Sequence, residues 1–169
     1  QMADVAHDGK ATGEIVVRSP WLTQGYLHNP AASEHLWAGG YLHTGDIGVI
    51  DAKGCLQVTD RMKDVIKTGG EWISSLELES IISDHPAVNE VAVVGIKDDK
   101  WGERPLPLIV LKEGQSATLE DIKRHVQKHA DAGHISRYAI PDQVRFVDSL
   151  AKTSVGKLNK KVMREQIVG

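Results

Sequence analysis

Hydrophobic and polar residues follow different patterns in the two halves of the chain. Residues 1–60 contain short apolar runs separated by glycine, proline and aspartate, a pattern typical of strands and turns. Asp51-Ala52-Lys53-Gly54 has the residue types of a hairpin turn. The expected elements are strands at 13–18, 46–50 and 55–59 and a short helix at 30–36. Because few helical faces are available for burial, these residues look incomplete as an independent core.

After Gly70 the apolar residues form longer periodic segments. Ser74 and Glu77 fit a capping box at the start of a helix that His85-Pro86 ends. Val91–Gly95 is a continuous apolar run, as expected of a buried strand. The further expected elements are strands at 106–111 and 143–147, a helix capped by Thr118 that runs to about residue 130, and a closing helix at 160–166. This order predicts an α+β fold, a small C-terminal domain with a three-stranded sheet and flanking helices.

The change of pattern predicts a domain boundary near residues 61–64. We expect residues 1–62 to be the strand-rich tail of a large N-terminal domain and residues 63–169 to form the small domain. Roughly 100 residues is an ordinary domain size. The chain is therefore expected to be a piece of a longer protein.

The composition excludes some functions. Of the 169 residues, 41% are hydrophobic and 25% charged, and a net charge of −3 with no basic stripe gives no support for nucleic-acid binding. Cys55 is the only cysteine, so no intrachain disulfide is possible and a reducing, cytoplasmic location is expected. No apolar run reaches membrane-spanning length, which leaves peripheral contact as the only membrane role.

Metal binding is also not expected. Of the eight histidines, only His125 and His129 have the i,i+4 spacing that places two rings on one helical face. No HExxH or paired Cys/His pattern accompanies them.

Three segments carry candidate chemistry: Tyr-Leu-His-Thr-Gly-Asp at 41–46, Asp-Arg-Met-Lys-Asp-Val-Ile-Lys-Thr-Gly-Gly-Glu-Trp-Ile at 60–73, and Ala-Lys-Thr-Ser-Val-Gly-Lys at 151–157. In this order and spacing they resemble the last third of the adenylate-forming enzymes, the superfamily of acyl-CoA synthetases, luciferase-like enzymes and peptide-synthetase adenylation domains. The run Gly-Gly-Glu-Trp-Ile-Ser-Ser is most similar to medium- and long-chain fatty acid–CoA ligases. The resemblance covers nearly the whole chain, from about Gly13 to Arg164.

The resemblance implies a fatty acid–CoA ligase, which converts ATP, a carboxylic acid and CoA into acyl-CoA, AMP and pyrophosphate through an acyl-adenylate. Its partners would be ATP and AMP, coenzyme A and the carboxylic acid, with Mg²⁺ held mainly by the N-terminal domain. The family's phosphate-binding loop, its adenine- and Mg²⁺-gripping segment and its acyl pocket are absent from this chain. The isolated chain is therefore expected to be inactive.

Three alternatives remain. A short-chain or aromatic acid–CoA ligase shares every motif quoted. A carrier-loading adenylation domain is less favoured, because no linker or carrier domain follows Lys157. A non-enzymatic binding module would be favoured by loss of Lys157 or Asp46, and both are present.

The resemblance assigns the adenylation cation to Lys157. Joining a carboxylate to a phosphate brings two anions together, so a positioned cation is required. Gly156 lets the loop approach its target closely. One departure is Ala151, where the family usually has proline, which costs some loop rigidity. The alternative is a solvated lysine in a basic tail, with Lys160 among its neighbours.

Asp46 matches the family's ribose-binding aspartate, since one carboxylate can accept hydrogen bonds from both ribose hydroxyls. Its alternative is an aspartate that caps the turn after Gly45. Arg61 matches an arginine that reaches ribose or phosphate oxygens through charge-assisted hydrogen bonds. Its alternative is a surface ion pair with Asp60 or Asp64.

Lys63 matches the family's hinge, about which the small domain swings between adenylation and thioester formation. An ordinary exposed lysine is the alternative. The segment Gly69, Gly70, Glu71 and Trp72 would form the face used in the second step, because two glycines permit close approach to an extended pantetheine. Trp72 would line the path of the pantetheine or stack on adenine, and its alternative is burial in the core of the small domain. Lys67 matches a lysine that faces the active site in the second orientation, and its alternative is again a solvated side chain.

Overall fold

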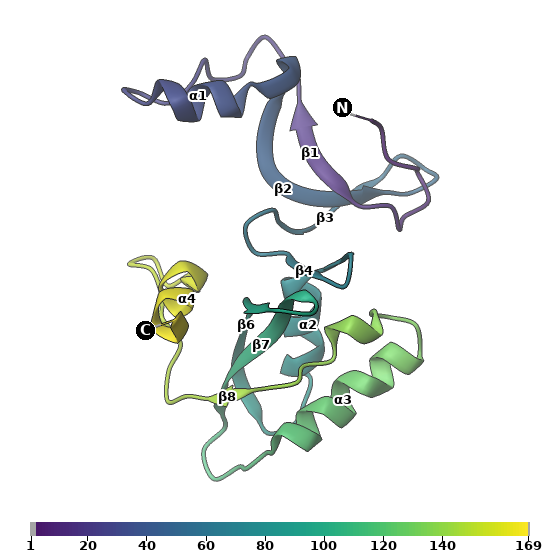
Figure 1. The fold of residues 1–169 in the computed structure, drawn as a ribbon, viewed down its shortest axis with the longest axis vertical. Coiled ribbons are helices and arrows are strands. Elements are labelled where there is room, and N and C mark those ends of the chain that lie inside the picture. The colour runs from purple at the N-terminus through teal and green to yellow at the C-terminus, as the bar shows by residue number, and fades with distance from the viewer. Residues whose placement is uncertain (1–2, 169) are drawn as a thin grey trace. The chain divides into compact units, whose positions relative to one another are not determined.

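The computed structural model describes residues 3–168. The chain forms two compact units, residues 1–63 and residues 64–169. Figure 1 shows the elements of each unit. Across the described residues, every helix falls short of the length and apolarity that crossing a bilayer requires.

The first unit is built on a three-stranded antiparallel sheet in the order β1-β2-β3. Its elements are β1 (Gly13–Val17), α1 (Pro30–Leu36), a 3₁₀ turn (Ala38–Gly40), β2 (Leu42–Ile50) and β3 (Leu56–Arg61). The expected helix and strands are confirmed, with β2 starting earlier than expected. Buried apolar side chains are few in this unit, namely Leu36, Ile47 and Val49. Leu56 and Val58 on β3 are 53% and 57% exposed, consistent with the expectation of an incomplete core.

The second unit is a mixed α+β domain, which confirms the expected fold class. Its elements are β4 (Ile66–Thr68), β5 (Glu71–Ile73), α2 (Ser75–Ser83), β6 (Val88–Asp98), β7 (Gly102–Leu111), α3 (Leu119–Asp131), a second 3₁₀ turn (Arg137–Ala139), β8 (Arg145–Phe146) and α4 (Lys160–Val168). The sheet has five strands rather than the expected three, in the order β5-β4-β7-β6 with β8 parallel to β7. The expectation omitted the β4–β5 hairpin, because each of its strands has only 3 residues.

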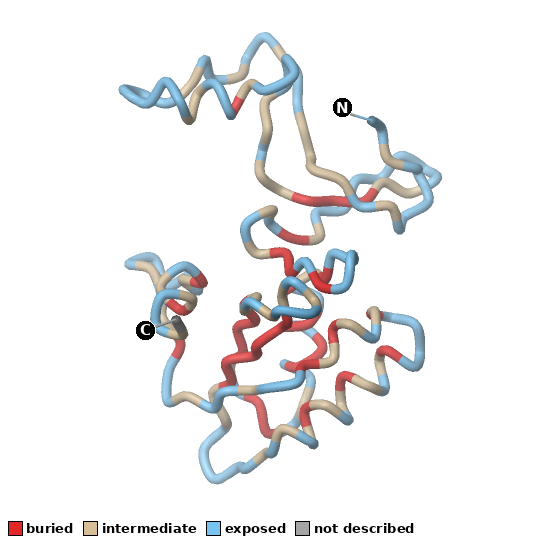
Figure 2. The backbone as a smooth tube through the Cα atoms, viewed as in Figure 1, coloured by how far each residue is buried: buried red, intermediate tan, exposed pale blue. Residues whose placement is uncertain are grey.

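The long β6–β7 hairpin separates two apolar layers. On one face, Val91 and Val93 of β6 pack with buried residues of α2 and α3. On the other face, Ala92 and Val94 pack with Met163 of α4. Successive side chains of a strand point to opposite faces, so the continuous apolar run of β6 serves both layers. Figure 2 shows the burial concentrated along this hairpin.

Side-chain caps start the two helices on the first face. The hydroxyl of Ser74 accepts a hydrogen bond from the backbone N–H of Glu77 at 3.1 Å, at the start of α2. Thr118 and Asp121 form a reciprocal capping box at the start of α3. Each cap satisfies N–H groups that the first helical turn leaves without a partner.

Candidate active-site elements

Asp46 and Arg61 face each other across β2 and β3. They are register partners in the antiparallel ladder, and Arg61 Nε lies 3.5 Å from Asp46 Oδ1. Both side chains keep solvent access, at 37% exposed for Asp46 and 62% for Arg61. Arg61 therefore forms its ion pair with Asp46, the other residue predicted to bind the nucleotide. The alternative drawn from the sequence was a pair with Asp60 or Asp64. Asp64 instead pairs with Arg164 of α4.

Hydrogen bonds between β1 and β2 fix the segment just before Asp46. The hydroxyl of Thr44 donates to the carbonyl of Ile15 at 2.8 Å. The ring of His43 contacts the Glu14 carboxylate at 2.7 Å and the carbonyl of Ala38 at 3.0 Å. The hydrogen bond with Glu14 raises the pKa of His43, because it favours the charged ring. This strand end is thus held in place by contacts that leave the Asp46 carboxylate accessible.

Lys63 is the last residue of the first unit, and Asp64 opens the second. The backbone N–H of Met62 donates to the carbonyl of Gly45 at 2.8 Å, which secures the chain up to that point. On the far side, the carboxylate of Asp64 accepts from Arg164. Lys63 is exposed and lies at the boundary between the two units, with an anchored residue on either side of it in the chain.

Gly69 and Gly70 form the tight turn between β4 and β5. Their φ values are +58° and +85°, a region that side-chain-bearing residues rarely adopt. A Cβ added to Gly69 would lie 2.8 Å from Cε1 of Tyr138, whereas one added to Gly70 would meet open space. Gly69 is thus required by packing as well as by conformation.

The residues that flank this turn point to solvent. Trp72 is 41% exposed, so the alternative of burial in the core is wrong. Lys67 is its cross-strand partner, with Nζ 5.5 Å from the centroid of the Trp72 ring. Glu71 is exposed on the same short strand. The hairpin presents an aromatic surface beside a cation, which suits a ligand with both apolar and anionic parts.

Arg104 supports the turn from beneath and was not anticipated from the sequence. Its guanidinium donates to the carbonyls of Tyr138 and Ile140, both at 2.8 Å, and to the carboxylate of Asp142 at 2.7 Å. This nearly buried arginine holds Tyr138 under Gly69. No motif pointed to it, because a lone arginine in a strand with prolines reads as a surface residue.

Lys157 is exposed on a closed loop that precedes α4. The loop is a small hairpin in which Lys152 and Leu158 form a bridge and the N–H of Thr153 donates to the carbonyl of Lys157 at 2.7 Å. Gly156 makes its turn with φ of +81°. The hydroxyl of Thr153 accepts from the Lys157 N–H at 3.2 Å, so this hydroxyl orders the loop.

Lys160, which the sequence presented as part of a basic tail, is buried. Its Nζ lies 2.6 Å from Oε1 of Glu79 and donates to the Ser75 hydroxyl at 2.8 Å, both on α2. Lys152, at the other end of the loop, pairs with Glu90 at 2.8 Å. The periodicity of α2 indicated an apolar face and did not indicate that Glu79 on this helix would form an ion pair with a lysine.

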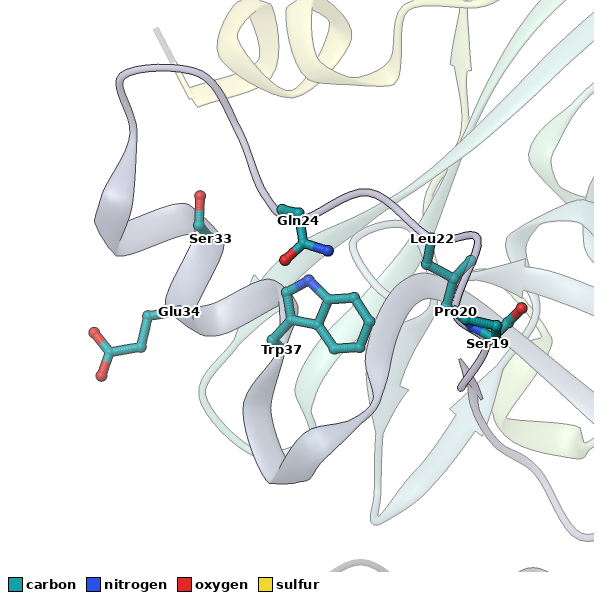
Figure 3. Close-up of a pocket in the computed structure, with 7 residues that line it drawn as sticks. All are labelled: Ser19, Pro20, Leu22, Gln24, Ser33, Glu34 and Trp37. Carbon is teal, nitrogen blue, oxygen red and sulfur yellow. The ribbon is translucent and has the colours of Figure 1, made fainter.

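None of the predicted site residues lines the hollow shown in Figure 3, which lies between α1 and the preceding loop. Trp37 forms part of its wall, and the indole N–H donates to the carbonyl of Thr23 at 3.1 Å. Within residues 3–168, no group of three or more His, Cys, Asp or Glu side chains is arranged to hold a metal ion.

Residues 64–169 have the α+β fold that the resemblance implied. The roles of Lys157, Asp46 and Arg61 stay predictions. Residues 77–157 match the model of the AMP-binding enzyme C-terminal domain. These residues belong to the AMP-binding enzyme C-terminal domain family, and proteins similar to the chain over nearly its whole length include acyl-CoA ligases.

Individual relatives agree with this assignment. The chain is 44% identical over 163 residues to a long-chain-fatty-acid–CoA ligase of Thermus thermophilus, covering 96% of this chain and 29% of the relative. It is 41% identical over 155 residues to a 2-succinylbenzoate–CoA ligase of a Geobacillus species, covering 92% of this chain and 30% of the relative. Among solved structures, ATP-bound MatB from Rhodopseudomonas palustris superimposes with a TM-score of 0.79 at 28% identity, over 96% of this chain and 33% of MatB. The chain thus spans less than a third of the length of these curated relatives.

Proposed function

We propose that this chain is the C-terminal part of a fatty acid–CoA ligase. The observation that carries the proposal is Lys157, an exposed cation at the end of a loop closed by its own hydrogen bonds, within an AMP-binding enzyme C-terminal domain. The similarity to a long-chain-fatty-acid–CoA ligase extends over 96% of the chain and supports the choice of substrate class.

In the first half-reaction, a carboxylate oxygen of the acid attacks the α-phosphorus of ATP and pyrophosphate leaves. Lys157 would place its ammonium against the negative charge that accumulates on the phosphoryl oxygens, and this charge is largest in the transition state. Asp46 would accept hydrogen bonds from the ribose hydroxyls, with Arg61 reaching a ribose or phosphate oxygen. The 3.5 Å pair between Asp46 and Arg61 supports this role, because both groups are already oriented toward one accessible region.

In the second half-reaction, the CoA thiolate attacks the acyl carbon of the adenylate and AMP leaves. The unit of residues 64–169 would turn about Lys63, so that the Gly69–Gly70 turn replaces Lys157 at the reaction centre. The open space above Gly70 supports an approach by pantetheine, and the cation of Lys67 beside Trp72 suits a phosphate-bearing chain. Mg²⁺ would be held mainly by residues of the large domain.

A ligase for aromatic acids is the second candidate. The 41% identity to a 2-succinylbenzoate–CoA ligase favours it, since the two identities differ little over nearly the same residues. The acyl pocket, which would distinguish them, belongs to the large domain.

The test is a substrate panel on the full-length enzyme that carries this chain. With ATP, CoA and Mg²⁺, acids of 6 to 18 carbons and aromatic acids are compared by kcat/KM for AMP release and by the acyl-CoA formed. The proposal expects the medium- and long-chain acids to be preferred. Preference for aromatic acids would support the second candidate, and absence of any CoA thioester with active adenylation would contradict both.

A matched assay uses the 169-residue chain alone. It should release no AMP under the same conditions, because the phosphate-binding loop and acyl pocket lie elsewhere. Sustained turnover by this chain at ordinary enzyme rates would contradict the division of labour proposed here.

A further inference from the structure

The loop that carries Lys157 has little packing of its own. Val155 is 77% exposed and Leu158 is 36% exposed, so neither anchors the loop in the core. Its shape comes from internal hydrogen bonds, including one from the Asn159 N–H to the Ala151 carbonyl at 2.9 Å. These bonds hold the loop as a unit, but they do not fix its direction relative to the sheet.

Lys160 connects this loop to the rest of the domain. It is the first residue of α4, only three positions beyond Lys157. Its Nζ contacts Glu79 Oε1 at 2.6 Å and the Ser75 hydroxyl at 2.8 Å. The same Oε1 accepts a hydrogen bond from the backbone N–H of Val93 at 2.7 Å. One carboxylate oxygen therefore joins the start of α4, the helix α2 and the strand β6.

The position of this cluster in the sheet explains its geometry. β6 is an edge strand, paired on one side with β7 alone. Glu79 lies on α2 and its side chain satisfies an N–H group of that edge, which would otherwise lack a ladder partner. The lysine then neutralises the carboxylate, and the two side chains are 9% and 11% exposed.

Stability is a weak reason for such a pair. Removing two charges from water costs several kcal/mol per ion, and an apolar pair of similar volume is often as stable or more so. What an apolar pair does not provide is a fixed direction, because hydrophobic contacts are non-directional. A charged pair that also bonds the Ser75 hydroxyl and the Val93 N–H holds the first residue of α4 in one place.

We propose that Lys160 and Glu79 are positioning residues for Lys157. The cluster of Lys160, Glu79 and Ser75 fixes the base of the loop on the rigid β6–β7 hairpin, so that the Lys157 ammonium is presented at a defined distance from the phosphate. The inference rests on the proposed role of Lys157 in adenylation. The second pair, Lys152 with Glu90, contributes less, because its side chains are 44% and 39% exposed and exposed pairs are weak.

The test uses the full-length enzyme with a double variant, Lys160→Met with Glu79→Gln. The glutamine keeps an acceptor for the Val93 N–H, and the removal of both charges leaves no unpaired ion in the core. Lys161→Met is the matched control, since Lys161 lies one residue along the same helix with an 83% exposed side chain. Lys160→Arg tests rescue, because it restores a cation at the same position.

Three quantities are measured: acyl-adenylate formation, thioester formation from preformed acyl-adenylate, and Tm. A displacement of about 1 Å at a catalytic group costs on the order of 10²-fold in rate. The double variant should therefore lose on the order of 10²-fold in adenylation kcat, with thioester formation changed less than about twofold and KM for ATP less affected than kcat. Lys160→Arg should recover most of the loss, and Lys161→Met should behave as wild type.

An equal loss in both half-reactions, or a loss that follows the drop in Tm, would mean that the pair only supports the fold and would overturn the proposal. An adenylation rate of the double variant within about threefold of wild type would also overturn the proposal, because a displaced cation should produce a much larger loss. If the double variant does not fold, Lys160→Gln combined with Glu79→Gln, which removes both charges and keeps a donor for Ser75, must show the same selective loss in smaller measure. A wild-type enzyme that forms no acyl-adenylate would instead refute the proposed function, and this inference with it.

Discussion

Replacing Gly69 or Gly70 by alanine separates the free-energy cost of a positive φ from the cost of a steric conflict at the β4–β5 turn. Both residues have positive φ, so either substitution places a Cβ in the left-handed region at a cost of about 1–2 kcal/mol. Only Gly69→Ala adds a steric conflict, since its Cβ would lie 2.8 Å from Tyr138 Cε1. The Tyr138 ring packs against Trp101 with centroids 5.4 Å apart, so it has little freedom to move away. Overpacking of this kind costs about 1–3 kcal/mol. Gly69→Ala should thus destabilise the second unit by about 2–5 kcal/mol and Gly70→Ala by about 1–2 kcal/mol.

Native-state hydrogen exchange of the β6 and β7 amides measures this difference, because core amides of the unit exchange through its global unfolding. A double-mutant cycle with Tyr138→Ala then isolates the steric part. In the Tyr138→Ala background, the two alanine substitutions should cost nearly the same amount. Equal destabilisation of the unit by Gly69→Ala and Gly70→Ala in the wild-type background would refute the argument.

Three further predictions concern other parts of the chain. Lys63→Pro, which fixes φ near −65°, should leave adenylation intact in the full-length enzyme and abolish thioester formation, whereas Lys63→Ala should preserve both. Arg104→Met should destabilise the second unit by about 3–5 kcal/mol in urea unfolding, because it leaves the carbonyls of Tyr138 and Ile140 without their donor. Burial and the neighbouring His125 lower the pKa of His85. As the pH falls, this ring therefore binds a proton in the unfolded chain before it does so in the folded one. The free energy of unfolding should thus decrease as the pH drops below about 6.5. Under urea titration at several pH values, His85→Gln should reduce that fall, and an unchanged pH dependence would contradict the assignment.

The sequence was most informative where local chemistry decides the structure. Asn29-Pro30 predicted the start of α1, and Thr118 predicted the start of α3, because caps act within one helical turn. The apolar run at 91–95 predicted β6 as a strand buried on both faces, and the structure extends it to Val88–Asp98. The motif residues Asp46 and Arg61 were predicted separately, and their pairing follows from the register of β2 and β3.

Long-range packing could not be predicted in this way. Lys160 looked like one of several tail lysines, but its partner Glu79 is far away in the sequence and only the fold brings them together. Arg104 and Tyr138 meet beneath Gly69 because the 3₁₀ turn between α3 and β8 carries Tyr138 there, and no local pattern indicates that contact. The β4–β5 hairpin was missed because its short strands carry no measurable alternation, and its Gly-Gly turn was read for its chemistry alone.

The proposed role of Lys157 as the cation for adenylation alone is tested by the two half-reactions of Lys157→Ala in the full-length enzyme. Acyl-adenylate formation from ATP and the acid is followed by pyrophosphate release, and thioester formation is followed from preformed acyl-adenylate and CoA. The first rate should fall by a factor on the order of 10²–10³ and the second should be largely unchanged, because the ammonium acts only on the first transition state. An equal loss in both rates, or an unchanged first rate, would contradict it.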